Sequence, residues 1–198
     1  MSDNHHHRCP AWVAKLLASP LRRLAENPER ILGPHVSPGM AVLEPGPGLG
    51  FFTLPMARMV GPEGRVVALE VQQSLRDGLE RRVRKAGLAD RVDCVLCDAG
   101  SATASKNGDG PDLAESSVDF CPVINVLHEL DDAGAFLALV LRVLRPGGRM
   151  LLMEPRGHVS EADFQSAMAH AEQAGFTVLE QGTDTARRQA LLARPEQA

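Results

Sequence analysis

The chain has 198 residues, of which 44% are hydrophobic and 23% charged, and it carries a formal net charge of −4. This length fits one domain, and the apolar fraction excludes a disordered chain. Proteins that bind nucleic acid through phosphates are usually basic, so nucleic acid is disfavoured as a partner. No apolar run approaches the roughly 18 residues of a membrane span, and residues 1–8 lack the apolar region of a secretory signal. We therefore expect a cytoplasmic protein with no membrane partner.

Residues 1–35 are predicted to form a helical appendage, and residues 36–198 the main domain. Trp12, Leu16 and Leu24 recur at helical spacing in the appendage, and Pro20 and Pro28 interrupt the pattern. We expect this segment to be an appendage to the main domain and not a second domain.

Strands and helices alternate along the main domain. Short apolar runs between turn residues predict strands over 40–44, 65–70, 91–97, 118–123, 149–154, 176–181 and 189–193. Helical spacing of apolar residues predicts helices over 49–60, 74–86 and 160–174, and a further helix that ends at Leu144 and is capped by Asp131 or Asp132. Ser74 is expected to cap the second of these helices and Gly87 to end it, and Ser160 to form a capping box with Asp163.

This alternation predicts an α/β fold, a doubly wound sheet of seven mostly parallel strands. The connection between the last two strands, residues 182–188, is too short for a parallel crossover, which needs a dozen or more residues. We therefore expect the last strand to run antiparallel to its neighbours.

The most informative segment is the glycine-rich turn after the first strand. Gly46, Gly48 and Gly50 stand at alternate positions, where the absence of Cβ lets a ligand approach the backbone. A plain tight turn is the simpler alternative. The dinucleotide fingerprint G-x-G-x-x-G requires its third glycine at position 51, which is Phe51.

Glu44-x-Gly46-x-Gly48-x-Gly50 resembles motif I of the class I S-adenosylmethionine-dependent methyltransferases. Further matches follow in the family's order, and the resemblance spans about residues 36 to 194. Glu70 ends the second strand, where the family places an acid on the ribose hydroxyls. Asp98 follows the third strand, where the family has an acid on the adenine amino group, with the backbone of Ala99 near the ring. Residues 144–149 resemble the turn before the family's fifth strand.

The resemblance implies a Rossmann-like methyltransferase fold that binds S-adenosylmethionine and transfers its methyl group by in-line displacement. We expect a small-molecule acceptor, because almost the whole chain is needed for the core fold, and a monomer or homodimer. The implied cofactor-binding residues are Glu44, Gly46, Gly48, Gly50, Glu70, Val71, Asp98, Ala99 and Asn125.

In the fold that the resemblance implies, N-terminal helices often lie across the cofactor site, so residues 1–35 are expected to cover the acceptor site as a lid. The acceptor side itself is expected at the end of the fourth strand, residues 124–130. This segment lacks the Asn/Asp-Pro-Pro-aromatic motif of nucleobase and amide methyltransferases and is closer to the quinone-biosynthesis and small-molecule branch. His128 is a candidate general base, because histidine titrates near neutral pH, and Glu129 lies beside it. The alternative is that His128 only packs at the junction between strand and helix.

Other readings remain open at the level of sequence. Glu70 and Asp98 could be solvated acids at strand ends. The protein could bind the cofactor without turnover, or it could be a nicotinamide-dependent oxidoreductase, although Phe51 disfavours that class.

No metal site is predicted. Cys94 and Cys97 have the spacing of half a zinc site, but residues three apart on a strand point to opposite faces and cannot share an ion. His5, His6, His7 and Cys9 form a cluster of possible ligands near the start of the chain, where adjacent histidines also suit a disordered end.

Overall fold

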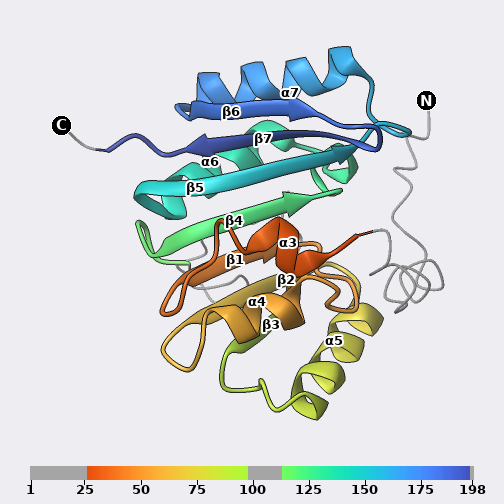
Figure 1. The fold of residues 1–198 in the computed structure, drawn as a ribbon, viewed down its shortest axis with the longest axis vertical. Coiled ribbons are helices and arrows are strands. Elements are labelled where there is room, and N and C mark those ends of the chain that lie inside the picture. Colours follow the sequence, from red (N-terminus) through yellow and green to blue (C-terminus); the bar gives the residue numbers. More distant parts are fainter. Residues whose placement is uncertain (1–25, 98–112, 197–198) are drawn as a thin grey trace.

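The computed structural model describes residues 26–97 and 113–196, and in this part of the chain one twisted sheet carries seven strands (Figure 1). Their order is β3-β2-β1-β4-β5-β7-β6. The strands are β1 (Ala41–Pro45), β2 (Arg65–Glu70), β3 (Val92–Leu96), β4 (Val118–Ile124), β5 (Leu144–Pro155), β6 (Thr177–Thr183) and β7 (Arg187–Ala193).

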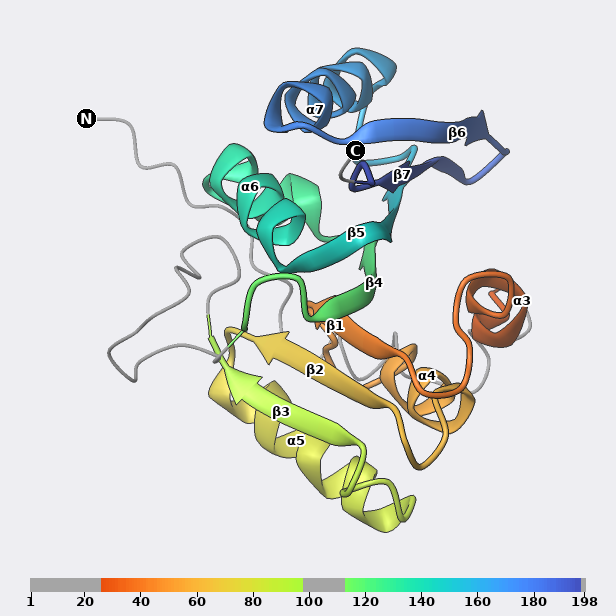
Figure 2. The same ribbon diagram turned by 90° about the vertical axis from the view of Figure 1, so that its left-hand side faces the viewer.

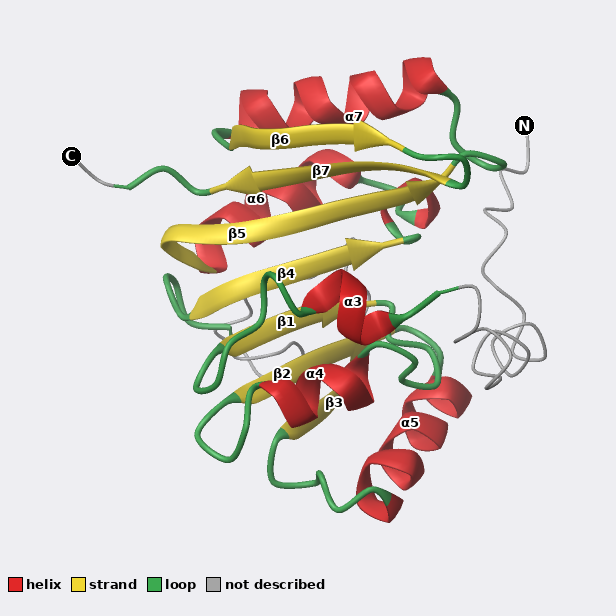
Figure 3. Ribbon diagram, viewed as in Figure 1, coloured by secondary structure: helices red, strands yellow, loops and turns green. Residues whose placement is uncertain are grey.

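Only β7 is antiparallel to its neighbours, β5 and β6. Figure 3 shows β4, β5 and β6 pointing one way and β7 pointing back between them. The predicted doubly wound sheet with an antiparallel last strand is confirmed. The short connection between β6 and β7 enforces this direction, because it cannot cross back over the sheet.

Helices cover both faces of the sheet, so the core has three layers. They are α3 (Pro28–Leu32), α4 (Thr53–Met59), α5 (Gln73–Lys85), α6 (Ala133–Val143) and α7 (Glu161–Ala174), with a 3-10 turn η1 (Leu127–Glu129) after β4. Figure 2 shows α6 and α7 on one face, with α3 and α4 on the other. Buried residues of α3, α4 and α5 form one apolar cluster, and those of α6 and α7 form the second.

The helix caps agree with the sequence at α7 and differ at α5. The capping box of Ser160 and Asp163 is present. The expectation that Ser74 caps α5 is wrong: the helix begins one residue earlier, and its N-cap, Gln72, makes no side-chain capping bond. Instead, the backbone N–H of Gln72 donates to the carboxylate of Glu70 at 2.9 Å, so an acid at the end of β2 fixes the start of this helix.

Two element boundaries also differ from the prediction. The helix expected over 49–60 begins only at Thr53, because the preceding residues remain in the glycine turn. The turn expected over 145–148 lies inside β5, where the register with β4 jumps from Val118↔Leu144 to Phe120↔Arg149. The glycines of this segment allow the strand to bulge without ending.

Of the predicted appendage, the structure describes residues 26–35, which include α3. Residues 1–25, among them Trp12 and the cluster His5–Cys9, lie outside the described residues. A search of the described helices finds none whose length and apolar character would let it cross a membrane.

Candidate active site

The predicted site residues gather at one edge of the sheet, where parallel strands end. Glu44 is the penultimate residue of β1, Glu70 is the last residue of β2, and Asn125 follows β4. The strand order reverses between β1 and β4, and their following helices, α4 and α6, lie on opposite faces. Such a reversal leaves a crevice beyond the strand ends, the usual ligand site of open α/β sheets.

The three glycines of the turn have different roles. All have left-handed backbone angles, with φ of +62° at Gly46, +54° at Gly48 and +81° at Gly50. A Cβ on Gly46 would lie 2.7 Å from Cγ2 of Val126, and one on Gly50 would lie 2.5 Å from Cδ1 of Leu79. These two glycines permit close packing. A Cβ on Gly48 would meet nothing within 4 Å, so this backbone borders open space.

Glu70 ties the glycine turn to the end of β2. The residue is 4% exposed, and its Oε2 accepts the backbone N–H of Gly48 at 3.1 Å, while Oε1 accepts that of Gln72. Burial raises the pKa of Glu70, and these N–H donors counteract the rise. A carboxylate offers about four acceptor positions, so Glu70 retains capacity for a ligand's hydroxyl groups.

Exposed apolar side chains flank this carboxylate. Among the described residues, the exposed large hydrophobic side chains are Val71, Leu96 and Leu179. Val71 follows Glu70 directly, and Leu96 is paired with Glu70 in the register of β2 and β3. Leu96 was missed by the sequence analysis, because strand register cannot be read from a single sequence. Val71 and Leu96 therefore offer an exposed apolar surface next to the carboxylate of Glu70.

Two buried oxygens in the crevice lack a hydrogen-bond partner. They are Oε2 of Glu44 and Oδ1 of Asn125, both within the described residues. Burial raises the pKa of Glu44 to about 8; the Thr53 side chain opposes this rise through a hydrogen bond, and the Glu70 carboxylate adds to it. Oγ1 of Thr53 is likewise buried and otherwise unpaired among the described residues. Asn125 has a left-handed backbone, with φ of +58°. Buried polar atoms are nearly always paired. Thr53 is a partner for Glu44, so Oδ1 of Asn125 is the oxygen that points to a donor group on a ligand.

On the acceptor side, η1 carries His128 toward a buried carboxylate at the end of β5. Nδ1 of His128 lies 2.5 Å from Oε2 of Glu154, and Oε1 of Glu154 accepts the backbone N–H of Leu127 at 2.9 Å. This bond raises the pKa of His128, while burial opposes the rise. Burial raises the pKa of Glu129, the other predicted catalytic residue.

Glu154 was not predicted as a site residue. The available signal was its position, because it ends an apolar run as Glu44 and Glu70 do. The ring of His158, from the loop after β5, lies edge-on to that of His128, with 6.0 Å between ring centroids.

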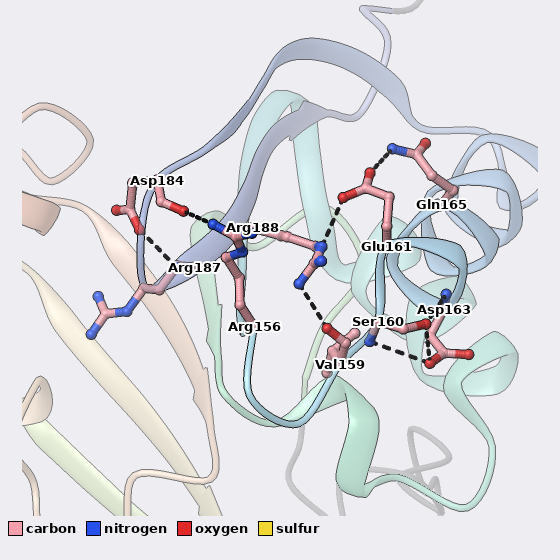
Figure 4. Close-up of polar contacts among 9 residues, drawn as sticks. All are labelled: Arg156, Val159, Ser160, Glu161, Asp163, Gln165, Asp184, Arg187 and Arg188. Carbon is pink, nitrogen blue, oxygen red and sulfur yellow. Dashed lines mark hydrogen bonds and ion pairs between the residues drawn. The ribbon is translucent and has the colours of Figure 1, made fainter.

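The loop that carries His158 is fastened to the hairpin between β6 and β7 (Figure 4). Arg188, which is 8% exposed, donates from Nη1 to the carbonyl oxygen of Val159 at 2.7 Å and from Nε to Glu161 at 2.8 Å. Arg156 donates to the carbonyl oxygen of Asp184 at 2.9 Å. These contacts hold the loop after β5, and with it His158, in a fixed position on the acceptor side.

Helix α5 contacts the glycine turn at Leu49. Nη1 of Arg82 donates to the carbonyl oxygen of Leu49 at 2.5 Å. Gly78 allows this approach, because a Cβ there would lie 2.6 Å from Cδ2 of Leu49. The sequence analysis treated α5 only as a packing helix and missed Arg82.

Some predicted residues cannot be placed in the crevice. Asp98 and Ala99 lie outside the described residues. Cys94 and Cys97 pack against different core clusters, which confirms that they face opposite sides of the sheet. Among the described residues, no group of three or more His, Cys, Asp or Glu side chains is arranged to hold a metal ion.

A separate cleft of about 730 Å³ lies between α3 and the β6–β7 hairpin. Leu151, Met153 and Leu191 belong to its apolar part, and Arg30, Glu180 and Arg187 are among its charged lining residues. None of the predicted cofactor or catalytic residues lines it.

Residues 43–152 match the family described as the methyltransferase domain, which is more than half of the chain. The chain belongs to this methyltransferase family. The match includes the glycine turn, Glu70 and η1. The predicted class of S-adenosylmethionine-dependent methyltransferases is confirmed, and with it the cofactor.

Similar curated proteins include ubiquinone/menaquinone biosynthesis C-methyltransferases named UbiE. That of Shewanella halifaxensis is 27% identical over 117 residues, which are 59% of this chain and 43% of the relative. That of Pasteurella multocida is 32% identical over 121 residues, which are 60% of this chain and 41% of the relative. The matched region therefore spans less than half the length of these relatives.

Solved structures share the fold. A SAM-dependent methyltransferase from Aquifex aeolicus aligns with a TM-score of 0.80 at 22% identity, over 94% of this chain and 99% of the other. The [4+2]-cyclase SpnF aligns with a TM-score of 0.72 at 16% identity, over 85% and 80%. These likenesses establish the architecture, which serves more than one reaction.

Proposed function

We propose that this protein transfers a methyl group from S-adenosylmethionine to a small-molecule acceptor, in the crevice beyond the carboxyl ends of β1 and β4. The observation that carries the proposal is the open space beside the backbone of Gly48, whose N–H is held by the buried Glu70 carboxylate at the end of β2. The amino-acid tail of the cofactor carries an ammonium group, which would supply a donor to Oδ1 of Asn125. Its positive charge also suits a site rich in carboxylates.

The remaining contacts divide between the two other parts of the cofactor. Glu70 is proposed to accept hydrogen bonds from both ribose hydroxyls, since its oxygens retain free acceptor positions. Val71 and Leu96 would lie against the adenine ring, which covers their exposed apolar surface. The family resemblance adds Asp98 and Ala99 at the edge of that ring. The backbone of Gly46, Gly48 and Gly50 lines the path of the amino-acid tail.

When bound, S-adenosylmethionine supplies a methyl group activated by its sulfonium sulfur. The chain's contribution is to align acceptor, methyl carbon and sulfur, which can be worth roughly 7–11 kcal/mol. We assign His128 the removal of a proton from the acceptor, with Glu129 beside it. The UbiE relatives act in quinone biosynthesis by name, so a quinone precursor is the first acceptor to test.

The appendage, residues 1–35, is proposed to close over the acceptor. Its described end meets the hairpin through an ion pair between Glu26 and Arg187. Both side chains are largely buried, at 5% and 18% exposure, so the appendage is attached at the hairpin that holds the loop after β5.

Titration calorimetry with S-adenosylmethionine and its demethylated product tests cofactor binding, with NAD⁺ as the control ligand. We expect both adenosyl ligands to bind and NAD⁺ not to bind. Demethylated product should then accumulate when a small-molecule extract is added. Binding without turnover on any extract would favour a non-catalytic binding protein, and binding of NAD⁺ alone would overturn the proposal.

A further inference from the structure

Glu154 is the buried carboxylate that joins the end of β5 to the turn after β4. Its side chain is 2% exposed, and both oxygens are engaged. One oxygen accepts the backbone N–H of Leu127 and fixes the start of η1. The other lies 2.5 Å from Nδ1 of His128. A single side chain thus holds the backbone and the imidazole ring of the same short turn.

This arrangement determines which ring nitrogen carries a proton. An ionised carboxylate can only accept hydrogen bonds. Nδ1 of His128 must therefore donate to Glu154, and in the neutral ring the lone pair is left on Nε2. The same partner also stabilises the imidazolium that forms when Nε2 takes up a proton. His128 is 23% exposed, so part of its side chain is accessible from outside the protein.

We propose that Glu154 is the positioning residue that keeps Nε2 of His128 free as a proton acceptor, and that the acceptor substrate is one that must lose a proton to react. This inference rests on the proposed function. The substrate class comprises hydroxyl groups and carbons made acidic by a neighbouring hydroxyl or carbonyl group. Acceptors that are already thiolates or neutral amines have no need of such a base.

The proton and electrons of the step balance. Nε2 takes the acceptor's proton, and the electron pair left on oxygen, or on the conjugated carbon, forms the new bond to the methyl carbon. The bond between methyl carbon and sulfur breaks, and its electron pair stays on sulfur, which becomes neutral. Imidazolium and the carboxylate of Glu154 then form an ion pair until the proton passes to water.

Other charged groups also face this pair. Glu129, on η1 itself, favours the protonated ring of His128 and so raises the pKa of His128. The carboxylate of Glu70 in β2 raises the pKa of Glu129. His158 comes from the loop after β5 and lies edge-on to His128. Glu154 makes the direct contact, so its replacement should have the largest effect on the ring.

The test uses full-length protein labelled with ¹⁵N-histidine, saturated with the demethylated cofactor. Nitrogen shifts and couplings report which nitrogen of His128 is protonated, and a pH titration reports its pKa. In the wild type we expect the neutral ring to carry its proton on Nδ1. In Glu154→Gln, the amide oxygen can still accept from Leu127, and its NH₂ then faces Nδ1. The proton should move to Nε2, and the pKa should fall by about 1 to 3 pH units.

Glu172→Gln, on the exposed side of α7, is the matched control and should leave both readouts unchanged. With a methylated acceptor in hand, Glu154→Gln should lower kcat at least about tenfold with unchanged KM for S-adenosylmethionine. The acid limb of its rate profile should move to lower pH.

The outcomes separate the two proposals. If demethylated cofactor does not bind the wild type, the proposed function fails. If it binds but the neutral wild-type ring carries its proton on Nε2, only the role of Glu154 is overturned, and this holds even if Glu154→Gln does not fold. An unchanged tautomer and pKa in folded Glu154→Gln would overturn it as well.

Discussion

Gly48 and Gly87 form a natural pair for separating backbone strain from ligand contact. Both have a left-handed backbone, with φ of +54° and +69°, and a Cβ on either meets nothing within 4 Å. Alanine at either position should cost about 1–2 kcal/mol of stability. Only Gly48→Ala should also weaken cofactor binding, by about tenfold or more, equal to about 1.4 kcal/mol. Calorimetry and thermal melts check both, and equal affinities would exclude the glycine turn as the cofactor site.

Glu70 should contribute to affinity as a charged acceptor. Hydrogen bonds to charged groups contribute about 1.5–3 kcal/mol, so Glu70→Gln should bind S-adenosylmethionine roughly 10- to 150-fold more weakly. Glu63→Gln, on the exposed turn before β2, should bind as the wild type does. Calorimetry of both variants decides, and unchanged affinity in Glu70→Gln would mean that another group binds the ribose.

Glu44 should make cofactor binding depend on pH. Its pKa is raised from 4.5 to about 8, mainly by burial, so the carboxyl group is mostly neutral at pH 6. A bound ammonium favours the charged form and lowers this pKa. Affinity for S-adenosylmethionine should therefore rise between pH 6 and pH 8, with protons released on binding.

Two controls isolate this effect of Glu44. Methylthioadenosine lacks the amino-acid tail, so its affinity should change little over the same pH range, and Glu44→Gln should flatten the dependence for S-adenosylmethionine. A rise that persists in Glu44→Gln would assign the proton to another group. Without ligand, the raised pKa also means that the free energy of unfolding falls as pH increases from 4.5 through 8. Glu44→Gln should lose this decline in thermal melts.

At the scale of elements, α5 acts on the site through Arg82. Its bond to the carbonyl oxygen of Leu49 fixes the turn one residue after Gly48, whose N–H is bound by Glu70. Arg82→Met should weaken cofactor binding by about 1 kcal/mol, roughly fivefold. Arg84→Met removes an exposed partner of Glu80 on the same helix and should leave affinity unchanged. Equal effects of the two substitutions on calorimetric affinity would refute a specific role for Arg82.

The elements also show what the sequence could predict. β2 was predicted with its observed bounds, because its apolar run ends abruptly in Glu70. Local patterns equally predicted α7 and the direction of β7. The start of α5 was predicted wrongly, because it depends on a bond from Gln72 to Glu70, and competing caps are not resolved by local preference alone.

The site was predictable only where its residues follow a local motif. The glycine turn and Glu70 carry such a motif. The contact between His128 and Glu154 joins residues 26 apart in the chain, and the exposure of Leu96 depends on the pairing of β3 with β2. Such contacts arise from tertiary packing, so the sequence suggested His128 without its partner.

At the scale of the whole molecule, bound cofactor should protect segments that are distant in sequence. The crevice is formed by the ends of β1, β2 and β4. In hydrogen exchange with demethylated cofactor, residues 44–50, 70–72 and 125–129 should slow together. The hairpin at 183–187, which borders the separate cleft, is the internal control and should not change. Protection of the hairpin alone would move the ligand to that cleft.

The pairing of β1 with β4 has a consequence for how the protein is made. Ala41 bonds through its backbone N–H to the Asp119 side chain, 78 residues later in the chain. Closing so long a loop is slow compared with forming local contacts. During synthesis, a ribosome-bound chain that ends before β4 has the glycine turn but only one wall of the crevice. The nascent polypeptide cannot complete this crevice until β4 has been translated.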